Sequence, residues 1–529
     1  MKNIVKYYLV LILVFTGWSC KDYFELDRPS MFPWLSASEL ELAVREPYRY
    51  MTEMEPWFNP LGTLSLVQFA QSDIPQLLTK AQQGNNYAVQ YYNRQYNSIL
   101  PDKEVYNVFR ALYTMVTATN APLQLINDAE AKGVDPFEGM VPADREKVKR
   151  FKGELLFMRA VAYWYLARLY APPFDPQGSN EGRYFVLRRS YVSNAAELKN
   201  APLGSVAEVW KSIREDLEDA KKLLSEDYVE GEGRSRANKF AASAMLCRTY
   251  FMMGEHEKAK AECDYIIENG AKNGGLYDLL QDPIAAFNRT GTEICREIIW
   301  EIAFNTSTSE FDRIPGIFGK NIYNGVRTGN YSTFTMSYST LKQIGWMVDG
   351  KNGDYTETEG AREDKRYRQT WRRYEPYGQP NGDPNASVQI EEPHVWLDKY
   401  FRAANGTSAN RYANRPCIRL AEVYLTRAIL RFNASDKIGA AADVNVVRRR
   451  AGLADIDANV LTANDIHNER IKELAGENGD RTYYLIGLRL PIGISDRDPG
   501  KFSPIQPPYS DYYWQVPIVE QQQNQAYNK

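Results

Sequence analysis

The chain has 529 residues, of which 44% are hydrophobic and 25% are charged, and its 64 basic and 67 acidic side chains give a formal net charge of −3. This apolar content excludes a wholly disordered chain, and the balanced charge excludes a polycation that holds nucleic acid by neutralising phosphates alone. A mean hydropathy of −0.50, with no second apolar run of membrane-spanning length, excludes a protein with several membrane spans.

The N-terminus has the pattern of an export signal. Lys2 and Lys6 precede an apolar stretch over residues 7–15, which is too short to cross a bilayer, so we predict that residues 1–19 are a removable signal peptide. Cys20 follows in an arrangement that resembles a bacterial lipoprotein box. That resemblance implies acylation of Cys20 and a lipid anchor for the mature chain. Ordinary signal cleavage beside a coincidental cysteine stays open as the alternative.

Three long segments then carry apolar residues at the period of an α-helix. They are residues 107–128, 144–170 and 205–224, and the last has Val209, Ile213 and Leu217 four positions apart. Pro172-Pro173 is expected to end the second segment, because proline cannot continue a helix. The chain is therefore predicted to be dominated by helices.

Residues 237–270 predict two antiparallel helices that meet at Gly254. Their spacing of apolar and small residues resembles a tetratricopeptide repeat, in which small residues let the two helices approach closely. A looser pair is expected over residues 417–450. Because such repeats stabilise one another by stacking, three or four pairs are expected in all.

Few cysteines and histidines are available for chemistry. Cys247 and Cys263 fall at packing positions between the two predicted helices, so we interpret them as small buried hydrophobic residues rather than nucleophiles. His256 is expected at the surface of the second helix. The other cysteines of the mature chain are Cys20, Cys295 and Cys417, and no histidine or cysteine has the spacing of a zinc site. We therefore predict no metal and no cofactor.

Long irregular stretches separate the helices, at residues 72–101, 287–338 and 349–393. Such connections are uncommon in a compact body and often carry function. One of them contains basic residues interleaved with aromatic residues over residues 364–374, a pattern that by itself suggests single-stranded nucleic acid. The predicted export of the chain argues against nucleic acid as a partner.

Several segments together resemble one protein family. Residues 152–170 begin with Lys152-Gly153-Glu154-Leu155-Leu156-Phe157-Met158-Arg159-Ala160, and residues 419–425 and 444–453 include Arg419-Leu420-Ala421-Glu422 and Arg450-Ala451-Gly452-Leu453. Residues 466–481 add Glu469-Arg470, Glu473-Leu474 and Gly479-Asp480-Arg481. In this order the motifs resemble those of the SusD/RagB outer-membrane nutrient-uptake lipoproteins of Bacteroidetes.

The resemblance implies the fold class and the division of the chain. The expected fold is the all-α dominated SusD-like fold, a tetratricopeptide-like superhelix of helix pairs with long, loop-rich insertions. After the signal peptide, residues 20–529 would form a single body. Residues 20–235 would be its SusD-like N-terminal region, and residues 236–529 would hold the remaining helical repeats, the insertions and the C-terminal RagB/SusD region.

The resemblance also implies a function. The protein would be a cell-surface lipoprotein of the outer membrane that binds an oligosaccharide or polysaccharide. It would deliver this nutrient to a SusC-like TonB-dependent transporter, over which it sits as a lid. Two alternatives stay open: the same lid with a peptide or another nutrient as cargo, and, more distantly, a surface glycoside hydrolase. No enzyme motif is found, and we predict a protein without catalytic residues.

Charged residues of the matching motifs lie at helical spacing, and we interpret them as a buried ion-pair lattice that holds the helices together. The alternative is a catalytic pair of carboxylates, for which no nucleophile, metal site or histidine stands nearby. The residues concerned are Arg419, Glu422, Arg448, Arg450, Glu469, Arg470 and Glu473.

Aromatic residues in the irregular stretches are the candidates for sugar contacts, because a flat ring can cover the apolar C–H face of a pyranose. The proposed ligand residues are Trp57, Tyr87, Tyr91, Tyr92, Tyr96, Tyr323, Tyr331 and Trp346, with Phe334 and Tyr338 as further candidates. By contrast, aromatic residues on the predicted helices are expected in the core, namely Trp164, Trp210, Tyr250 and Tyr424.

Overall fold

The computed structural model describes most of the chain from residue 37 onward, in segments. These are residues 37–52, 67–77, 87–95, 103–131, 133, 142–192, 194–283, 285–287, 289, 291–303, 322–323, 326–327, 334–350, 355–369, 371–373, 395–397, 399, 414–510 and 512–528. Cys20, with the rest of the predicted N-terminal signal region, lies outside them.

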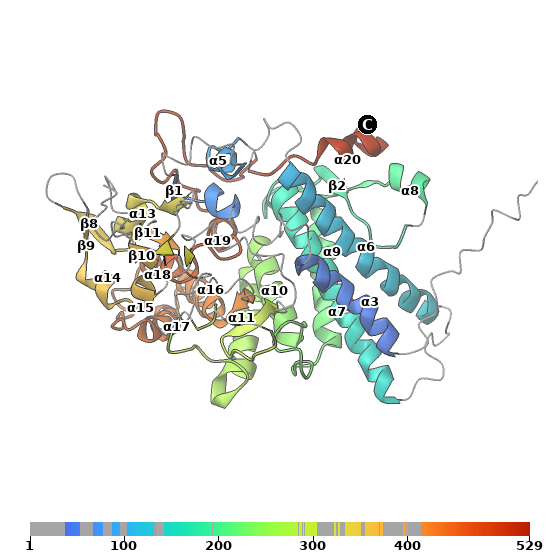
Figure 1. Ribbon diagram of the computed structural model, residues 1–529, viewed down its shortest axis with the longest axis horizontal. Helices are drawn as coiled ribbons and strands as arrows, with labels where there is room; N and C mark the ends of the chain where they lie inside the picture. The colour runs from blue at the N-terminus through green and yellow to red at the C-terminus, as the bar shows by residue number, and fades with distance from the viewer. Residues whose placement is uncertain are drawn as a thin grey trace, which may run out of the picture.

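Four long helices lie side by side on one side of the molecule (Figure 1). They are α3 (Ala37–Thr52), α6 (Lys103–Ala131), α7 (Pro142–Tyr170) and α9 (Val206–Leu223). Helix α7 is central, since it contacts the other three and is buried on nearly all sides from residue 153 to its end. It stops one residue before the Ala171-Pro172 bond, so the predicted proline stop is confirmed.

Local capping chemistry explains where these helices begin. Ser205 accepts a hydrogen bond from the Glu208 amide, and the Glu208 carboxylate accepts one from the Ser205 amide, so a reciprocal capping box starts α9. Asn238 caps the next helix by accepting from the Ala241 amide, and Thr462 forms a second capping box with Asp465 at the start of α18 (Ala463–Leu474). Each cap satisfies amides that the first helical turn would leave unbonded.

Two helix pairs stack against each other in the middle of the molecule. The first is α10 (Lys239–Met252) with α11 (His256–Tyr265), which continues as a π-helical turn, η2 (Ile266–Ala271). The second is α16 (Leu420–Asn433) with α17 (Lys437–Arg450), and α11 packs against α16. Both predicted tetratricopeptide-like pairs are therefore confirmed, as is the predicted all-α dominated fold.

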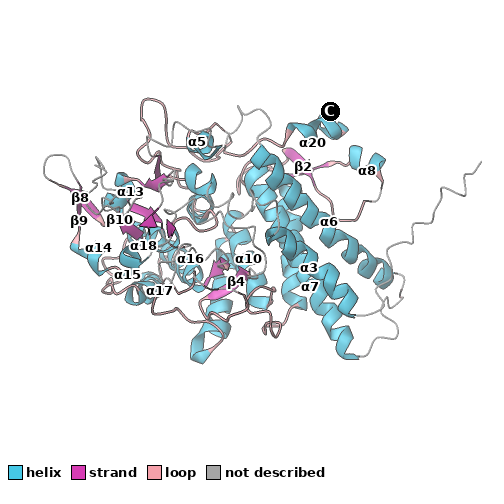
Figure 2. Ribbon diagram, viewed as in Figure 1, coloured by secondary structure: helices cyan, strands magenta, loops and turns pink. Residues whose placement is uncertain are grey.

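Short elements fill the other side of the molecule and its edges (Figure 2). In the described parts of the chain the strands form two-stranded antiparallel sheets. The strands are β1 (Pro75–Leu77) with β7 (Phe334–Met336), β2 (Arg183–Val186) with β3 (Leu203–Ser205), β4 (Ile298–Ile302) with β12 (Arg415–Arg419), β5 (Ile322–Tyr323) with β6 (Val326–Arg327), β8 (Met347–Asp349) with β9 (Tyr355–Glu357), and β10 (Trp371–Arg373) with β11 (Val395–Leu397). The short helices are α5 (Tyr87–Tyr92), α8 (Ala195–Lys199), α13 (Tyr338–Gln343), α14 (Glu359–Glu363), α15 (Lys365–Gln369), α19 (Asp480–Gly487) and α20 (Ile518–Gln523), with 3₁₀ turns η3 (Lys272–Gly274) and η5 (Gln525–Asn528).

One apolar core runs through the helices and most of these short elements. Trp164 and Trp210 are fully buried in it, Tyr250 is buried, and Tyr424 is half-buried against it, as predicted for helix aromatics. His256 lies on the first turn of α11, as expected, and is half-buried there. Its Nε2 atom lies 3.1 Å from the Gly487 carbonyl oxygen, because α19 packs onto the turn between α10 and α11.

Candidate functional site

The charged motif residues form the predicted buried lattice. Arg419, which ends β12, donates to Glu473 at 3.0 Å and to Glu477 at 2.8 Å, and it also bonds Glu297. Arg450 at the end of α17 bonds the same Glu473 and Glu297. A strand and two helices are therefore joined by carboxylates that each serve more than one guanidinium.

A second part of the lattice joins α10, α16, α18 and α19. Arg248 holds the Glu422 carboxylate through two hydrogen bonds, at 2.7 and 2.6 Å, and Arg470 holds Asp480 at 2.9 and 2.6 Å. The Tyr483 hydroxyl donates to Glu422 and accepts from Arg470. Paired guanidinium and carboxylate groups with all these bonds satisfy the rule that buried charges are compensated.

Electrostatics in the lattice do not suit acid catalysis. Burial by itself raises the pKa of Glu473, but the guanidinium groups of Arg450, Arg419 and Arg366 outweigh it and hold that pKa well below its ordinary value. A carboxyl group that stays ionised at all moderate pH values cannot donate a proton to a leaving group. Glu473 is therefore a structural member of the lattice, in agreement with the prediction.

The basic and aromatic run at residues 364–374 also contributes to this lattice. Arg366 is buried and donates to Asp364 at 2.9 and 2.8 Å and to Glu473 at 3.2 Å. Tyr367 is buried as well, with its ring 5.2 Å from that of Trp346. Since these groups face inward, this part of the run offers no cationic surface to a nucleic acid.

Five of the aromatic candidates are core residues, which corrects their prediction as ligand contacts. Tyr91 has 1% of its surface exposed and Trp346 has none, while Tyr92, Phe334 and Tyr338 are also buried. Tyr91 packs on Trp514 and Tyr92 packs on Phe334, with ring centroids 5.1 and 5.6 Å apart. The rings of these loops cover one another, so they cannot present a flat face to a sugar.

The remaining aromatic candidates stay predicted ligand contacts. Tyr87 belongs to α5 and Tyr323 to β5. Trp57, Tyr96 and Tyr331 lie outside the described residues.

Segments from both ends of the sequence hold α5 in place. Arg497 donates to the carbonyl oxygens of Ala70, Ser72 and Tyr92 at 2.6, 3.1 and 2.8 Å. Arg94, just after α5, donates to the carbonyl oxygen of Gly493 at 2.7 Å. These side chains bind the loop around residue 495 to α5 and to the short helical turn before β1, so α5 is held on the body by a segment from the far end of the sequence.

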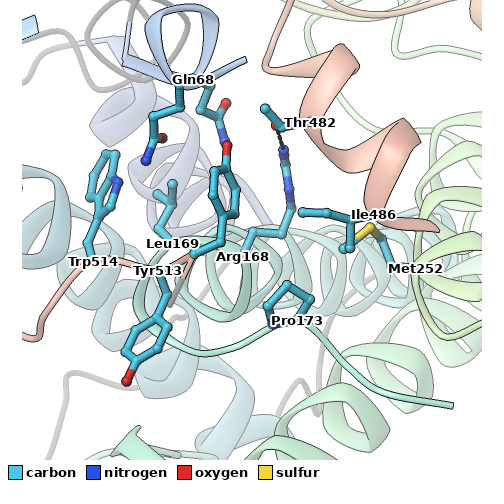
Figure 3. A pocket seen from close by; sticks show the side chains of 11 residues that line it. Gln68, Arg168, Leu169, Pro173, Met252, Thr482, Ile486, Tyr513 and Trp514 are labelled. Carbon is cyan, nitrogen blue, oxygen red and sulfur yellow. Dashed lines mark hydrogen bonds between the residues drawn. The ribbon is translucent and has the colours of Figure 1, made fainter. Parts of the chain in front are cut away.

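A small hollow, partly open to solvent, lies between the end of α7, α19 and the C-terminal segment (Figure 3). Its aromatic wall is the run at residues 512–514, where Trp514 packs on Tyr91 and Tyr170. This run was not predicted as part of a site, although three consecutive aromatic residues are visible in the sequence. The lining residues are Gln68, Gln71, Arg168, Leu169, Pro173, Met252, Thr482, Ile486, Tyr512, Tyr513 and Trp514.

Arg168 is the charged group of the hollow. Its guanidinium lies 4.3 Å from the centroid of the Trp164 ring and donates to Thr482 Oγ1 at 3.4 Å (Figure 3). Among the described residues its Nη1 atom has no hydrogen-bond partner. Burial lowers the pKa of Arg168 to about 10. Cation–π contact with Trp164 therefore stabilises this buried charge.

Two features that the described residues lack bear on function. They contain no group of three or more histidine, cysteine, aspartate or glutamate residues placed to hold a metal ion. No helix within them has the length and apolar character needed to cross a bilayer.

Comparisons with known proteins cover nearly the whole chain. A family model described as "Starch-binding associating with outer membrane" matches residues 66–251, and one described as "SusD family" matches residues 296–483. A curated relative, SusD-like protein P2 of Formosa agariphila, is 24% identical over 98% of this chain and 97% of its own.

Solved structures share the fold. A SusD superfamily protein of Bacteroides thetaiotaomicron is 19% identical and superposes with a TM-score of 0.71, covering 93% of this chain and 98% of its own. Surface glycan-binding protein A of the same species, solved with laminarihexaose, is 15% identical with a TM-score of 0.67, again over 93% and 98% of the two chains. The whole described body, helix pairs and insertions together, therefore has known counterparts.

Proposed function

Because the chain belongs to the SusD/RagB family, we propose that it captures a glycan at the cell surface and passes it to a SusC-like TonB-dependent transporter, which it covers as a lid. The observation that carries this proposal is the match of the entire body to a fold that includes a protein solved with laminarihexaose. The ion pairs of the lattice, in which Glu473 stays ionised, support a binding role rather than a hydrolytic one.

We place the glycan at the loops around α5 and β5. Tyr87 and Tyr323, together with Trp57, Tyr96 and Tyr331, are the residues proposed to cover pyranose rings. If one stacked ring removes about 100 Å² of apolar surface from water, it contributes about 2–2.5 kcal/mol before entropy costs. Two or three such rings give affinities between roughly millimolar and micromolar, which suit capture followed by release.

A panel of polysaccharides and oligopeptides tests the cargo. The purified mature protein with Cys20→Ser is expected to be retained by at least one polysaccharide in affinity electrophoresis. Tyr87→Ala and Tyr323→Ala should each weaken that retention by about tenfold or more, the equivalent of one lost ring. Tyr265→Ala is the matched control, because Tyr265 lies on α11, at the opposite edge of the view in Figure 1 from α5.

Two outcomes would contradict the proposed cargo. Binding of oligopeptides without retention on any polysaccharide would show that the cargo is a peptide rather than a glycan. If both tyrosine variants are retained like the wild type and the Tyr265 variant is not, the glycan does not bind at α5.

The lipid anchor is tested separately from the ligand. Two or more acyl chains hold a protein on a bilayer essentially permanently, since each buried methylene contributes about 0.8 kcal/mol. We expect the wild-type protein in the outer-membrane fraction and Cys20→Ser in the soluble fraction, with Cys295→Ser as the control that stays on the membrane.

Copurification of a large β-barrel protein with the anchored form, and not with an unrelated lipoprotein, tests the transporter partnership.

A further inference from the structure

Two thiols meet in the first helix pair. Cys247 lies on α10 and Cys263 on α11, and their Sγ atoms are 3.2 Å apart. Nonbonded carbon atoms, which are smaller than sulfur, have their optimum at about 3.5–4.0 Å. The two sulfur atoms are thus closer than ordinary packing requires.

The surrounding contacts fix this approach. Gly254, with a φ of +75°, turns the chain between the helices, and four residues before Cys247 the Ser243 hydroxyl bonds Glu262 on α11. On the other side Asp264 accepts from Arg427 of α16 at 3.0 Å. Glu262 and Asp264, on either side of Cys263 in the sequence, therefore bond α10 and α16. The packing of three helices thus holds the two sulfur atoms close together.

We propose that Cys247 and Cys263 form a disulfide that covalently closes this helix pair. A disulfide requires the sulfur atoms to approach from 3.2 Å to about 2.0 Å, which small adjustments of the two side chains supply. This inference rests on the proposed function in one respect, because a protein at the cell surface is in a compartment where disulfides persist.

The oxidation balances with a disulfide exchange protein as the oxidant. Cys247 and Cys263 together lose two electrons and two protons and gain an S–S bond, while the disulfide of the exchange protein is reduced to two thiols. One cysteine first forms a mixed disulfide with the exchange protein. The thiolate of the other cysteine then attacks that bond, and the exchange protein leaves as a thiolate. Both cysteines are buried in the folded chain, so the exchange takes place before α10 and α11 have packed fully.

The other cysteines of the body provide internal controls. Cys295 and Cys417 are also buried and free, and among the described cysteines neither has a second thiol in contact. The sulfur of Cys417 instead lies 3.7 Å from the Arg415 carbonyl oxygen. Similar burial without a neighbouring thiol should leave both as thiols under the same conditions.

The test maps thiols on the full-length protein taken from the native membrane fraction. After denaturation without reductant, alkylation is expected at Cys295 and Cys417 only, and a peptide pair joined through Cys247 and Cys263 should appear that reduction separates. In Cys247→Ser the Cys263 thiol should become alkylated, whereas in Cys417→Ser the joined pair should remain. Free Cys247 and Cys263 in membrane-anchored, glycan-binding protein would overturn the disulfide and leave the proposed function intact.

A second measurement does not depend on location or on the variants folding. Purified, reduced wild-type protein is unfolded and refolded in a glutathione redox buffer, and its intact mass is compared with that of protein refolded with reductant. Loss of two hydrogen atoms, together with a melting temperature a few degrees higher, is expected. Refolded protein that keeps its full mass and four reactive body thiols would contradict the proposal.

Discussion

Neighbouring arginines at the end of α17 have opposite surroundings. Arg450 is buried and bonds Glu297 and Glu473, whereas Arg449 is exposed and pairs with Asp455 at the surface. Removing one partner from a buried ion-pair cluster leaves uncompensated charge and is strongly destabilising, whereas exposed pairs contribute little. The same residue type therefore has different energetic weight one position apart.

This difference gives a matched test of the lattice. Arg450→Met is expected to lower the free energy of unfolding by about 3 kcal/mol, because Glu473 and Glu297 lose a shared cation. Arg449→Met should leave chemical denaturation unchanged within error. Equal effects of the two substitutions would show that burial of the lattice contributes nothing to stability.

His467 introduces a pH dependence of stability. Its Nδ1 atom lies 2.7 Å from the Tyr484 hydroxyl, and burial, with Arg481 and Arg470 nearby, lowers the pKa of His467 to about 4. The unfolded chain therefore takes up this proton near pH 6.5, before the folded protein does. Stability present above pH 6.5 is lost as the pH falls toward 4.

The size of this loss is measurable by denaturation at several pH values. A shift from about 6.5 to about 4 corresponds to about 3 kcal/mol. His467→Gln should remove that part of the decline between pH 6.5 and 4, while His256→Gln should retain it. An unchanged pH profile in His467→Gln would assign the decline to other groups.

At the scale of elements, the turn of the first helix pair depends on a glycine for two separate reasons. Gly254 has a φ of +75°, and a Cβ atom there would lie 2.7 Å from the Pro176 ring. Gly231 has nearly the same φ, +76°, with nothing within 4 Å of a Cβ atom. The two positions therefore separate backbone strain from steric contact.

Alanine at each position tests this separation. Gly231→Ala is expected to cost about 1–2 kcal/mol, the strain of a left-handed conformation alone. Gly254→Ala should cost a further 1–3 kcal/mol, roughly the range for overpacking, because Pro176 must move. Thermal denaturation checks both, and equal losses would mean that the Pro176 segment yields without cost.

Helix pairs could be predicted from sequence because their pattern is local, whereas the burial of loop aromatics could not. Cys247, Gly254 and Cys263 lie within one repeat, and the spacing of the repeat fixes their environment. Tyr91, in contrast, is covered by Trp514, more than four hundred residues later. Glu297 is similar, because it completes the lattice from an irregular stretch in which no periodicity marks it. Pairings at such separations depend on the whole topology.

At the scale of the whole molecule, contacts across residue 235 join the two regions. Arg236 bonds Glu154 of α7 through two hydrogen bonds, and the Phe157 and Trp164 rings of the same helix pack on Trp300 and Tyr483. We therefore expect a fragment of residues 20–235 to lack a cooperative thermal transition. Adding the fragment 236–529 during refolding should restore one, measured by near-ultraviolet circular dichroism. A fragment 20–235 that melts cooperatively alone would identify an independent domain.

The late position of Arg497 and Trp514 in the chain also determines when folding can finish. Arg497 holds the carbonyl groups of residues 70, 72 and 92, and Trp514 covers Tyr91. A ribosome makes these two residues more than four hundred residues after it has made α5. Until then the segment around α5 lacks the hydrogen bonds of Arg497 and the cover of Trp514, so this part of the body can complete its packing only after those later residues have been made.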